Sequence, residues 1–373
     1  MRIGLPKEIK NHEYRVGLTP ASVLELTRRG HEVRVQSSAG AAIGFSDDDY
    51  RAAGAQIVAD AQAVFADSEL IVKVKEPQAE ERARLTPQHT LFTYLHLAPD
   101  RPQTDDLIAS GATCIAYETV TDAQGRLPLL APMSEVAGRM SVQAGAHCLE
   151  KAQGGRGVLL GGVPGVAPGK VVILGGGVVG SNALAMAVGL GADVTVLDKS
   201  VDTLRRLDSL YGNRITTLYS TVAAVEEHAR TADLLIGGVL IPGAAAPKLV
   251  SAELVKQMQP GSVIVDVAID QGGCVATAKP TTHAEPTYVV DGVVHYCVAN
   301  MPGGVARTST LALNNATLPF VLALADKGAK RALQEDVHLR NGLSVAQGQL
   351  TCESVAQAHG LGWLSAEKML ERL

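Results

Sequence analysis

Short runs of β-branched and aliphatic residues alternate with helical spacings of apolar residues over the first third of the chain. We predict strands at 2–5, 32–36, 55–58, 70–75, 90–95 and 113–119, with a helix over 19–30 between the first two. Thr19 and Pro20 suit the first turn of that helix, and Gly30 suits its end. Such alternation is typical of parallel strands joined by crossover helices.

A second set of alternating segments follows a break in this rhythm. A helix that begins near Pro132 or Ser134 and runs towards Gln153 is predicted to separate the two sets. The second set predicts six strands of a doubly wound sheet, at 170–175, 193–198, 214–220, 233–239, 262–269 and 295–300. After Asn300 no further strand is predicted. Residues 307–328 predict a long helix perturbed at Pro319, and shorter helical segments follow.

Together the two sets predict an α/β protein with two doubly wound, Rossmann-like domains, joined by long interdomain helices and separated by a cleft. The first domain is predicted to be discontinuous, because the last helices return to it: it comprises residues 1–130 and 305–373. The second domain comprises residues 131–304. A length of 373 residues fits two domains, since roughly 100 to 200 residues per domain is usual.

Composition narrows the classes of function. A formal charge of −5 leaves no general basic field to attract nucleic acid or an anionic membrane surface. Prolines, glycines and Lys170 interrupt the most apolar region, residues 157–180, so we predict no membrane span. The chain starts with charged residues and lacks a signal-peptide core. Its five cysteines are scattered and never spaced as Cys-x-x-Cys, which favours reduced thiols in the cytoplasm over disulfides or a zinc cluster.

The most informative motif is a glycine-rich turn with the spacing Gly175-x-Gly177-x-x-Gly180. That spacing alone is weak evidence in a chain with 38 glycines, and a merely tight structural turn is the alternative. Here, however, it directly follows an apolar strand and opens a helix, so its backbone can approach a pyrophosphate at a helix N-terminus. The next strand ends at Asp198, where a carboxylate accepts hydrogen bonds from an adenosine ribose. The four elements together predict a dinucleotide site.

Asp198 also favours NAD over NADP, because a carboxylate repels a 2′-phosphate. Arg205 and Arg206 lie near enough in sequence to keep NADP open as an alternative. Their ordinary interpretation is the solvated face of a helix.

Four polar residues follow predicted strands, at the edge where wound sheets bind ligands. Lys75, His96 and Asp270 stand at or just after strand ends, and Arg15 lies in the loop that leaves the first strand. Arg15, Lys75 and His96 supply the groups that a nicotinamide enzyme acting on a small oxoacid or amino acid needs: a cation for the carboxylate, an electrophile at the carbonyl, and an acid-base group.

Each candidate also has an ordinary structural interpretation. Arg15 suits a surface cation, and Asp270 suits a cap for the turn "DQGG". Lys75 suits a solvated strand end, and Lys73 shares its face, so only one of the two need be functional. His96 is one of ten histidines, although its place between an apolar strand and the break "LAPDRP" sets it apart.

We predict no metal site, because histidines and cysteines do not cluster. The closest pair, His295 and Cys297, is interpreted as alternation along a strand.

The chain resembles the NAD-dependent alanine dehydrogenases over essentially its whole length. The N-terminal "GLPKEIKNHEYRVGLTP" is similar to a signature shared by these enzymes and the nucleotide-binding subunit of proton-translocating transhydrogenases. The motifs "VKVKEP", "YLHLAPD", "LLAPMSEVAGRM", "VDVAIDQGG" and "VANMPGGVARTST" match in order.

The resemblance implies reversible conversion of L-alanine and NAD+ to pyruvate, ammonium and NADH by a homohexamer. It implies Arg15 and Lys75 as substrate ligands, His96 as the acid-base catalyst and Asp270 as the second catalytic residue. Beside the glycine turn and Asp198, it implies these cofactor-binding residues: Ser134, Val178, Val179, Ser220, Val239, Leu240, Val267, Ala268, Ile269, Asp270, Lys279, Val298, Ala299, Asn300 and Met301.

Two alternatives remain at this point. A transhydrogenase subunit shares the N-terminal signature but passes hydride between two nucleotides and needs no acid-base histidine. A non-catalytic NAD-binding protein keeps the glycine turn and loses the polar residues. The presence of "YLHLAPD" and of all four polar residues favours the dehydrogenase.

Overall fold

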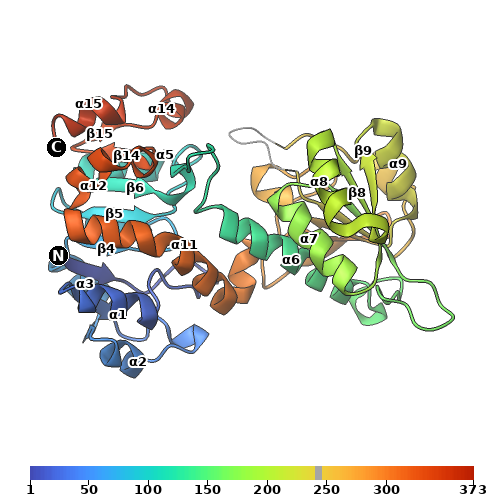
Figure 1. The fold of residues 1–373 in the computed structure, drawn as a ribbon, viewed down its shortest axis with the longest axis horizontal. Helices are drawn as coiled ribbons and strands as arrows, with labels where there is room; N and C mark the ends of the chain where they lie inside the picture. The colour runs from blue at the N-terminus through green and yellow to red at the C-terminus, as the bar shows by residue number, and fades with distance from the viewer. Residues whose placement is uncertain (240–245) are drawn as a thin grey trace. The chain divides into compact units, whose positions relative to one another are not determined.

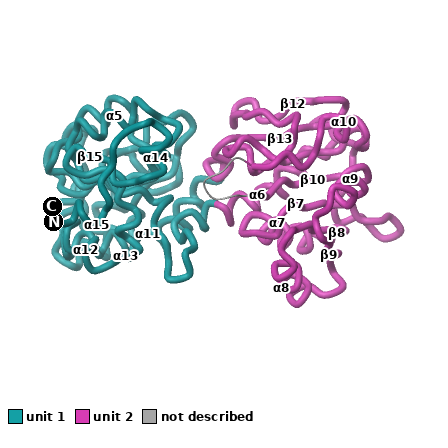
Figure 2. The backbone as a smooth tube through the Cα atoms, turned by 90° about the horizontal axis from the view of Figure 1, so that it is seen from above, with its two compact units in different colours: residues 1–133, 305–373 teal, residues 134–304 magenta. Residues whose placement is uncertain are grey.

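The computed structural model describes residues 1–239 and 246–373, and the chain forms two compact units (Figure 1). Unit 1 comprises residues 1–133 and 305–373, and unit 2 comprises residues 134–304 (Figure 2). The chain leaves unit 1 in the first turn of α6 (Ala131–Cys148) and returns at the end of the 3-10 helix η6 (Met301–Val305).

Unit 1, within the described residues, holds one eight-stranded sheet in the order β15-β14-β6-β5-β4-β1-β2-β3. Strands β1 to β6 pair in parallel, whereas β14 and β15 add an antiparallel edge beside β6. The strands are β1 (Arg2–Leu5), β2 (Glu32–Gln36), β3 (Gln56–Val58), β4 (Leu70–Val72), β5 (Thr90–Thr93), β6 (Thr113–Ala116), β14 (Leu343–Ala346) and β15 (Gln349–Leu350).

The antiparallel edge shows that the prediction of no strand after Asn300 was wrong. All four residues of β14 are buried, and so short an apolar run has no periodicity that separates a strand from a helix. Gln347 and Gly348, with φ of 49° and 75°, form the tight turn into β15.

The helices of unit 1 include the predicted N-terminal helix. In α1 (Pro20–Arg28), the Thr19 side chain accepts a hydrogen bond from the Ser22 amide, and Pro20 takes the first helical position, which confirms the predicted start. The other helices are α2 (Asp47–Ala52), α3 (Ala61–Ala66), α4 (Ala79–Arg82), α5 (Arg101–Ser110), α11 (Ala306–Lys327), α12 (Ala329–Glu335), α13 (Val337–Arg340), α14 (Glu353–His359) and α15 (Ala366–Leu370).

Helix α11 runs unbroken through Pro319, so the predicted helix is confirmed without a break at that residue. The segment Met301–Lys327 is long and apolar enough to cross a membrane by length and composition alone, and 44% of its apolar window is buried. Its buried Asn314 accepts hydrogen bonds from the Thr19 amide and the Ser22 hydroxyl, each at 2.9 Å. The helix is therefore built into the core of unit 1.

Unit 2 contains a seven-stranded sheet in its described part, in the order β12-β13-β11-β10-β7-β8-β9. Six strands are parallel, as predicted, and β12 is antiparallel to β13. The strands are β7 (Lys170–Leu174), β8 (Asp193–Asp198), β9 (Thr216–Tyr219), β10 (Leu234–Gly237), β11 (Val263–Asp266), β12 (Thr287–Val290) and β13 (Val293–Tyr296). Strand β12 was not predicted, although Asp291 and Gly292 after it form a typical hairpin turn with positive φ at both residues.

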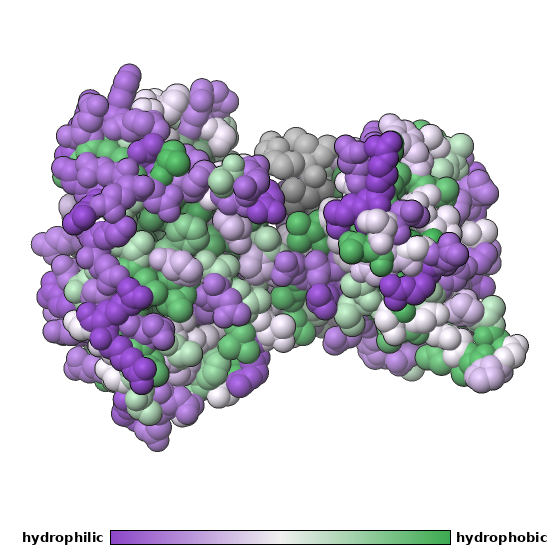
Figure 3. Space-filling model, in the orientation of Figure 1, coloured by the Kyte–Doolittle hydropathy of each residue, from purple (hydrophilic) through white to green (hydrophobic). Residues whose placement is uncertain are grey.

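Both faces of the unit 2 sheet are covered. Val171 and Ile173 of β7 enter one apolar cluster, whereas Val172 and Leu174 enter another. The helices are α6, α7 (Val178–Gly189), α8 (Val201–Tyr211), α9 (Val222–Thr231) and α10 (Ala252–Val255). Hydrophilic residues make up much of the face in Figure 3, and the exposed apolar side chains include Leu159, Val163 and Val166 of unit 2.

Several predicted strands extend too far at their carboxyl ends. The predicted strands 70–75, 90–95 and 262–269 end at Val72, Thr93 and Asp266. Beyond those points, side-chain carboxylates take the backbone N–H groups: Glu8 accepts from residues 74 and 75, Glu118 from residues 95 and 96, and Asp266 from residues 268 and 275. The apolar pattern continues there, whereas backbone pairing is reduced to single bonds such as that from the Tyr94 N–H to the Val74 carbonyl at 3.2 Å.

Candidate active site and nucleotide site

Three adjacent parallel strands of unit 1 lead to predicted site residues. Strands β5, β4 and β1 are neighbours in the sheet. His96 follows β5, Lys75 follows β4, and Arg15 lies between β1 and α1. Because the carboxyl ends of parallel strands meet at one edge, the sheet directs all three segments to the same side of unit 1.

Arg15 is almost completely buried and is clamped by Glu13. Its Nε donates to Glu13 Oε1 at 2.7 Å and its Nη2 to Glu13 Oε2 at 2.6 Å, a bidentate pair with side chains only 2% and 1% exposed. Burial pushes the pKa of Glu13 upward, but hydrogen bonds and charge from Arg15 outweigh it and hold that pKa below its ordinary value. Arg15 Nη1 also donates to the Met133 sulfur at 3.1 Å. The plane of the guanidinium group is thus fixed.

Lys75 is a less tightly paired cation. Its side chain is 14% exposed, and its Nζ lies 4.0 Å from Glu76 Oε2. Burial lowers the pKa of the Lys75 ammonium group, Glu76 opposes that shift, and the nearby charge of Arg15 lowers the pKa further. A cation at low exposure with a loose partner is suited to polarising a ligand oxygen.

His96 has a strained backbone and an accessible ring. Its φ of 49° is unusual for a non-glycine residue. Glu118 accepts its N–H at 2.6 Å, and the Tyr94 ring stacks on the imidazole at a centroid distance of 5.6 Å. The imidazole is 45% exposed, with Nδ1 at 4.0 Å from Glu118 Oε1. The ring is oriented by its neighbours and can exchange protons with water.

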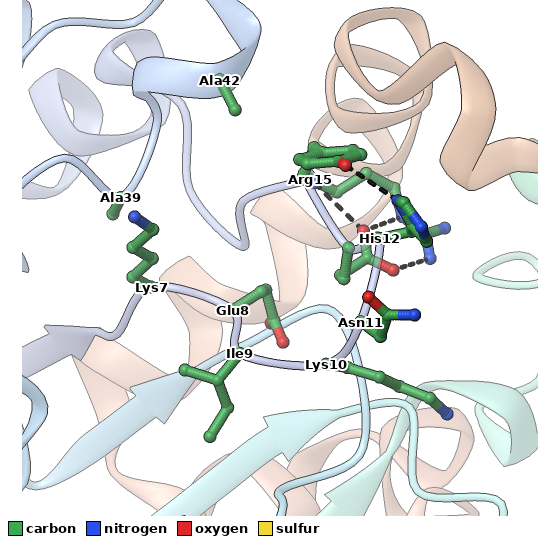
Figure 4. A pocket seen from close by; sticks show the side chains of 11 residues that line it. Lys7, Glu8, Ile9, Lys10, Asn11, His12, Arg15, Ala39 and Ala42 are labelled. Carbon is green, nitrogen blue, oxygen red and sulfur yellow. Dashed lines mark hydrogen bonds and ion pairs between the residues drawn. The ribbon is translucent and has the colours of Figure 1, made fainter. Parts of the chain in front are cut away.

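A pocket of about 400 Å³ opens along the segment after β1 (Figure 4). Its lining is residues 7–15 together with Ala39 and Ala42. It includes Arg15 but neither Lys75 nor His96.

In unit 2, the glycine turn has the geometry that its sequence predicts. Gly175 has φ of 93°, and Gly177 is the N-cap of α7. A Cβ on Gly180 would lie 1.7 Å from the carbonyl oxygen of Gly175, whereas one on Gly177 would meet nothing within 4 Å. Gly180 therefore allows strand and helix to pack closely, and Gly177 leaves open space at a helix N-terminus, where an anionic pyrophosphate fits.

Asp198 ends β8 beside this turn. Its Oδ2 accepts the Gly176 N–H at 2.6 Å, and its Oδ1 accepts the Ser200 N–H at 2.7 Å. Arg206 donates to the Gly176 carbonyl at 3.1 Å and to Ser181 Oγ at 3.0 Å, so it braces the turn as well as forming part of the helix surface. Arg205 pairs with Asp202 on an exposed surface.

Many remaining predicted cofactor residues follow other parallel strands of the same sheet. Ser220 follows β9, Val239 follows β10, residues 267–270 follow β11, and residues 298–301 follow β13. The exposed Asp270 lies in the 3-10 helix η5 (Val267–Gln271), whose N-terminus is capped by Asp266 and not by Asp270. These residues share the carboxyl edge that also carries the glycine turn.

Other predicted positions lie elsewhere in unit 2 or outside the described residues. Val178 and Val179 open α7, and Ser134 is a half-buried residue of α6. Lys279 is exposed, with its ammonium group 4.6 Å from the centre of the Tyr288 ring. Leu240 lies outside the described residues.

The acidic partners of the unit 1 site residues, Glu8, Glu13 and Glu118, were not predicted from the sequence. Glu118 follows the strand β6, so the strand-end criterion that selected His96 applied to it as well. Glu8 and Glu13 share a loop with Arg15, and only their pairing in space distinguishes them from surface carboxylates. Within residues 1–239 and 246–373, no group of three or more His, Cys, Asp or Glu is placed to hold a metal ion.

Known proteins resemble this chain over nearly its full length. The alanine dehydrogenase/PNT N-terminal domain model matches residues 4–137, and the corresponding C-terminal domain model matches residues 141–353. A protein from Halomonas elongata named alanine dehydrogenase is 64% identical over 370 residues, which cover 99% of this chain and 100% of that protein.

Solved structures show the same relationship. One named L-alanine dehydrogenase has a TM-score of 0.94 and 56% identity, and the match covers 96% of this chain and 99% of that one. A transhydrogenase from Sinorhizobium meliloti has a TM-score of 0.83 at 24% identity, over 94% of this chain and 100% of that one, a likeness of fold alone.

Proposed function

The chain belongs to the alanine dehydrogenase/PNT family, and we propose that it catalyses the reversible oxidative deamination of L-alanine to pyruvate and ammonium with NAD+ as hydride acceptor. The observation that carries this proposal is the set of Arg15, Lys75 and His96 after three neighbouring parallel strands. A transhydrogenase subunit has no need of this acid-base group. Full-length relatives named alanine dehydrogenase also favour the dehydrogenase.

Arg15 binds the substrate carboxylate in this proposal. Glu13 fixes the guanidinium through Nε and Nη2. Nη1 contacts the thioether of Met133, a weak acceptor that a carboxylate oxygen can replace with a stronger, charge-assisted bond.

Lys75 polarises the oxygen at C2 of pyruvate. An ammonium group at 14% exposure acts through a medium of lower dielectric than water, which strengthens its pull on a developing negative charge. The lowered pKa of Lys75 also brings its proton nearer to the range where it can be shared with that oxygen.

His96 moves protons between the substrate and water. Its exposed ring, oriented by Tyr94 and by the backbone bond to Glu118, meets the geometric need of a general acid and base that exchanges with solvent. Asp270 orients the amine or ammonia.

The unit 2 residues fit a nicotinamide dinucleotide. The open space at Gly177 receives the pyrophosphate, and Asp198 accepts hydrogen bonds from the adenosine ribose, which favours NAD over NADP. When bound, the nicotinamide supplies the acceptor for the hydride from the substrate Cα. Ser134, Ser220, Val239, Lys279 and residues 298–301 complete the nucleotide site.

Further properties are proposed on the family resemblance and the composition. The protein is a cytoplasmic homohexamer that binds small molecules and neither nucleic acid nor membranes. Its five scattered cysteines and its net charge of −5 support this setting.

The proposed function is tested by NAD+ reduction with L-alanine, with NADP+ and with L-lactate in place of L-alanine as controls. We expect turnover with L-alanine and NAD+, and much slower turnover with either control. Equal turnover with L-lactate would identify a hydroxyacid dehydrogenase instead.

A further inference from the structure

Lys73 is a fully buried cation that the proposed mechanism does not use. Its Nζ lies 2.9 Å from Glu8 Oε2 and 2.7 Å from Glu81 Oε1, and the three side chains are 0%, 3% and 2% exposed. Burial opposes the charged form of Lys73, but the two carboxylates outweigh it and raise the pKa of the ammonium group. The cation is held charged inside unit 1, two residues before Lys75.

Glu8 links this ion cluster to the Lys75 backbone. While Oε2 accepts from Lys73, Oε1 accepts the N–H of Val74 at 2.7 Å and the N–H of Lys75 at 3.3 Å. These two N–H groups follow the end of β4, where the sheet no longer pairs them. The buried Glu8 carboxylate thus accepts the N–H groups that the carbonyls of a neighbouring strand would otherwise accept.

The carbonyl groups of the same segment are held as well. The Tyr117 hydroxyl donates to the Lys73 carbonyl at 2.9 Å, and the Thr93 hydroxyl donates to the Lys75 carbonyl at 3.0 Å. With both N–H groups and these carbonyls bonded, the backbone at Lys75 has little freedom to shift.

We propose that Lys73 is a positioning residue for the dehydrogenase reaction: its ammonium group fixes the Glu8 carboxylate, which holds the Val74–Lys75 backbone and so aims Lys75 at the substrate oxygen. The inference rests on the proposed substrate role of Lys75. Burial raises the pKa of Glu8 and Lys73 opposes that rise, so loss of Lys73 removes a charge that stabilises the carboxylate as an acceptor.

Glu81 provides an internal comparison. It holds Lys73 from the other side and accepts the Gln78 N–H at 2.8 Å, but the bonds to residues 74 and 75 come from Glu8. Glu8→Gln is therefore expected to impair pyruvate binding more than Glu81→Gln does, at comparable loss of thermal stability.

The test compares Lys73→Met with Lys73→Arg, which keeps the charge. Leu107→Ala is the matched control, because it removes a fully buried apolar side chain from the unit 1 core and no charged group. Amide hydrogen exchange of the peptide around residues 70–80 reports backbone order without requiring activity. We expect faster exchange there in Lys73→Met than in Leu107→Ala, and near-wild-type exchange in Lys73→Arg.

Kinetics supply the second readout. We expect Lys73→Met to lower kcat/KM for pyruvate by at least about tenfold, because small misplacement of a reacting group is costly, with the Kd of NADH unchanged. In a Lys75→Ala background the same substitution should lower kcat/KM for pyruvate by less than about twofold, since the effects of two residues that act through one interaction are not additive.

Unchanged hydrogen exchange in both Lys73→Met and Glu8→Gln overturns the inference, whatever the role of Lys75. An equal loss of kcat/KM from Lys73→Met with and without Lys75 also overturns it, because Lys73 then acts elsewhere. A third outcome is faster exchange in Lys73→Met while both Lys73→Met and Lys75→Ala keep wild-type pyruvate kinetics. That outcome overturns the proposed role of Lys75 and with it the purpose assigned to Lys73.

Discussion

The role of each charged side chain in unit 1 depends on how closely it is paired with an opposite charge. Arg15 and Lys73 have carboxylate partners within 2.9 Å and are almost fully buried, which makes them fixed parts of the scaffold. Lys75 and His96 lie 4.0 Å from a carboxylate oxygen and are more exposed. Lys75 and His96 are therefore able to exchange partners when a substrate binds, and in Arg15 the same holds for Nη1, which faces the weak thioether acceptor of Met133.

For His96→Ala we expect turnover with pyruvate, ammonium and NADH to fall by at least about a hundredfold, the usual effect of losing an acid-base group. The Kd of NADH, measured by nucleotide fluorescence, should stay unchanged, because the glycine turn is in the other unit. Turnover within a few-fold of wild type would remove His96 from the mechanism.

Lys75 should give pyruvate binding an alkaline limit. Its pKa is lowered by burial and by Arg15, so the ammonium group loses its proton at lower pH than an ordinary lysine, whose pKa is about 10.4. Binding of oxamate, a non-reacting pyruvate analogue, should weaken as pH rises through that lowered pKa. In Lys75→Arg, whose side chain stays charged, this limit should disappear, and an identical limit in both proteins would assign it to another group.

Substitution by alanine should have different effects at two glycines of the nucleotide turn. Gly180→Ala puts a Cβ at 1.7 Å from a carbonyl oxygen and should destabilise unit 2 by about 1–3 kcal/mol or more. Gly177→Ala meets no protein atom within 4 Å, so it should change stability by less than about 1 kcal/mol but weaken NADH binding about tenfold. Thermal unfolding and NADH titration separate the two effects. Normal NADH binding in Gly177→Ala would place the pyrophosphate elsewhere.

At the scale of elements, the positions of the parallel strands along the chain could largely be predicted from the sequence, since apolar runs and turn residues mark them. Strand β14 was not, because its short buried run pairs with β6, which lies far away in the sequence. Strand β12 was also missed, although its turn to β13 is local. The strand-end rule selected Arg15, Lys75 and His96 as candidates. It could not reveal the bond between Lys73 and Glu8, which joins residues 65 positions apart.

Strand β12 should contribute to nucleotide binding through Tyr288. The Tyr288 hydroxyl accepts the Lys279 N–H at 2.8 Å and donates to the Thr277 carbonyl at 3.0 Å. Tyr288→Phe removes these bonds and keeps the ring below the Lys279 ammonium group. We expect NADH binding to weaken about 2- to 10-fold, from roughly 0.5–1.5 kcal/mol per hydrogen bond.

Val289→Ser, on the same strand at a side chain that is 61% exposed, is the control and should leave NADH binding unchanged. Equal effects of Tyr288→Phe and Val289→Ser, or none from Tyr288→Phe, would contradict a role for β12 in holding the Lys279 segment.

At the scale of the whole molecule, the proposed chemistry is divided between the two units. Unit 1 carries Arg15, Lys75 and His96, and unit 2 carries the glycine turn, Asp198 and Asp270. Length and alternating patterns suggested this division from the sequence. Which amino acid is oxidised depends on the packing of side chains around the substrate, which no apolar pattern encodes, so the reaction itself needs a direct measurement.

That measurement follows the hydride with NADH that carries deuterium at the transferring position of the nicotinamide. With pyruvate and ammonium we expect the deuterium to appear at Cα of L-alanine, and with ammonium omitted we expect no consumption of NADH. Consumption of NADH with pyruvate alone, or passage of the deuterium to a second nicotinamide nucleotide, would contradict an amino-acid dehydrogenase.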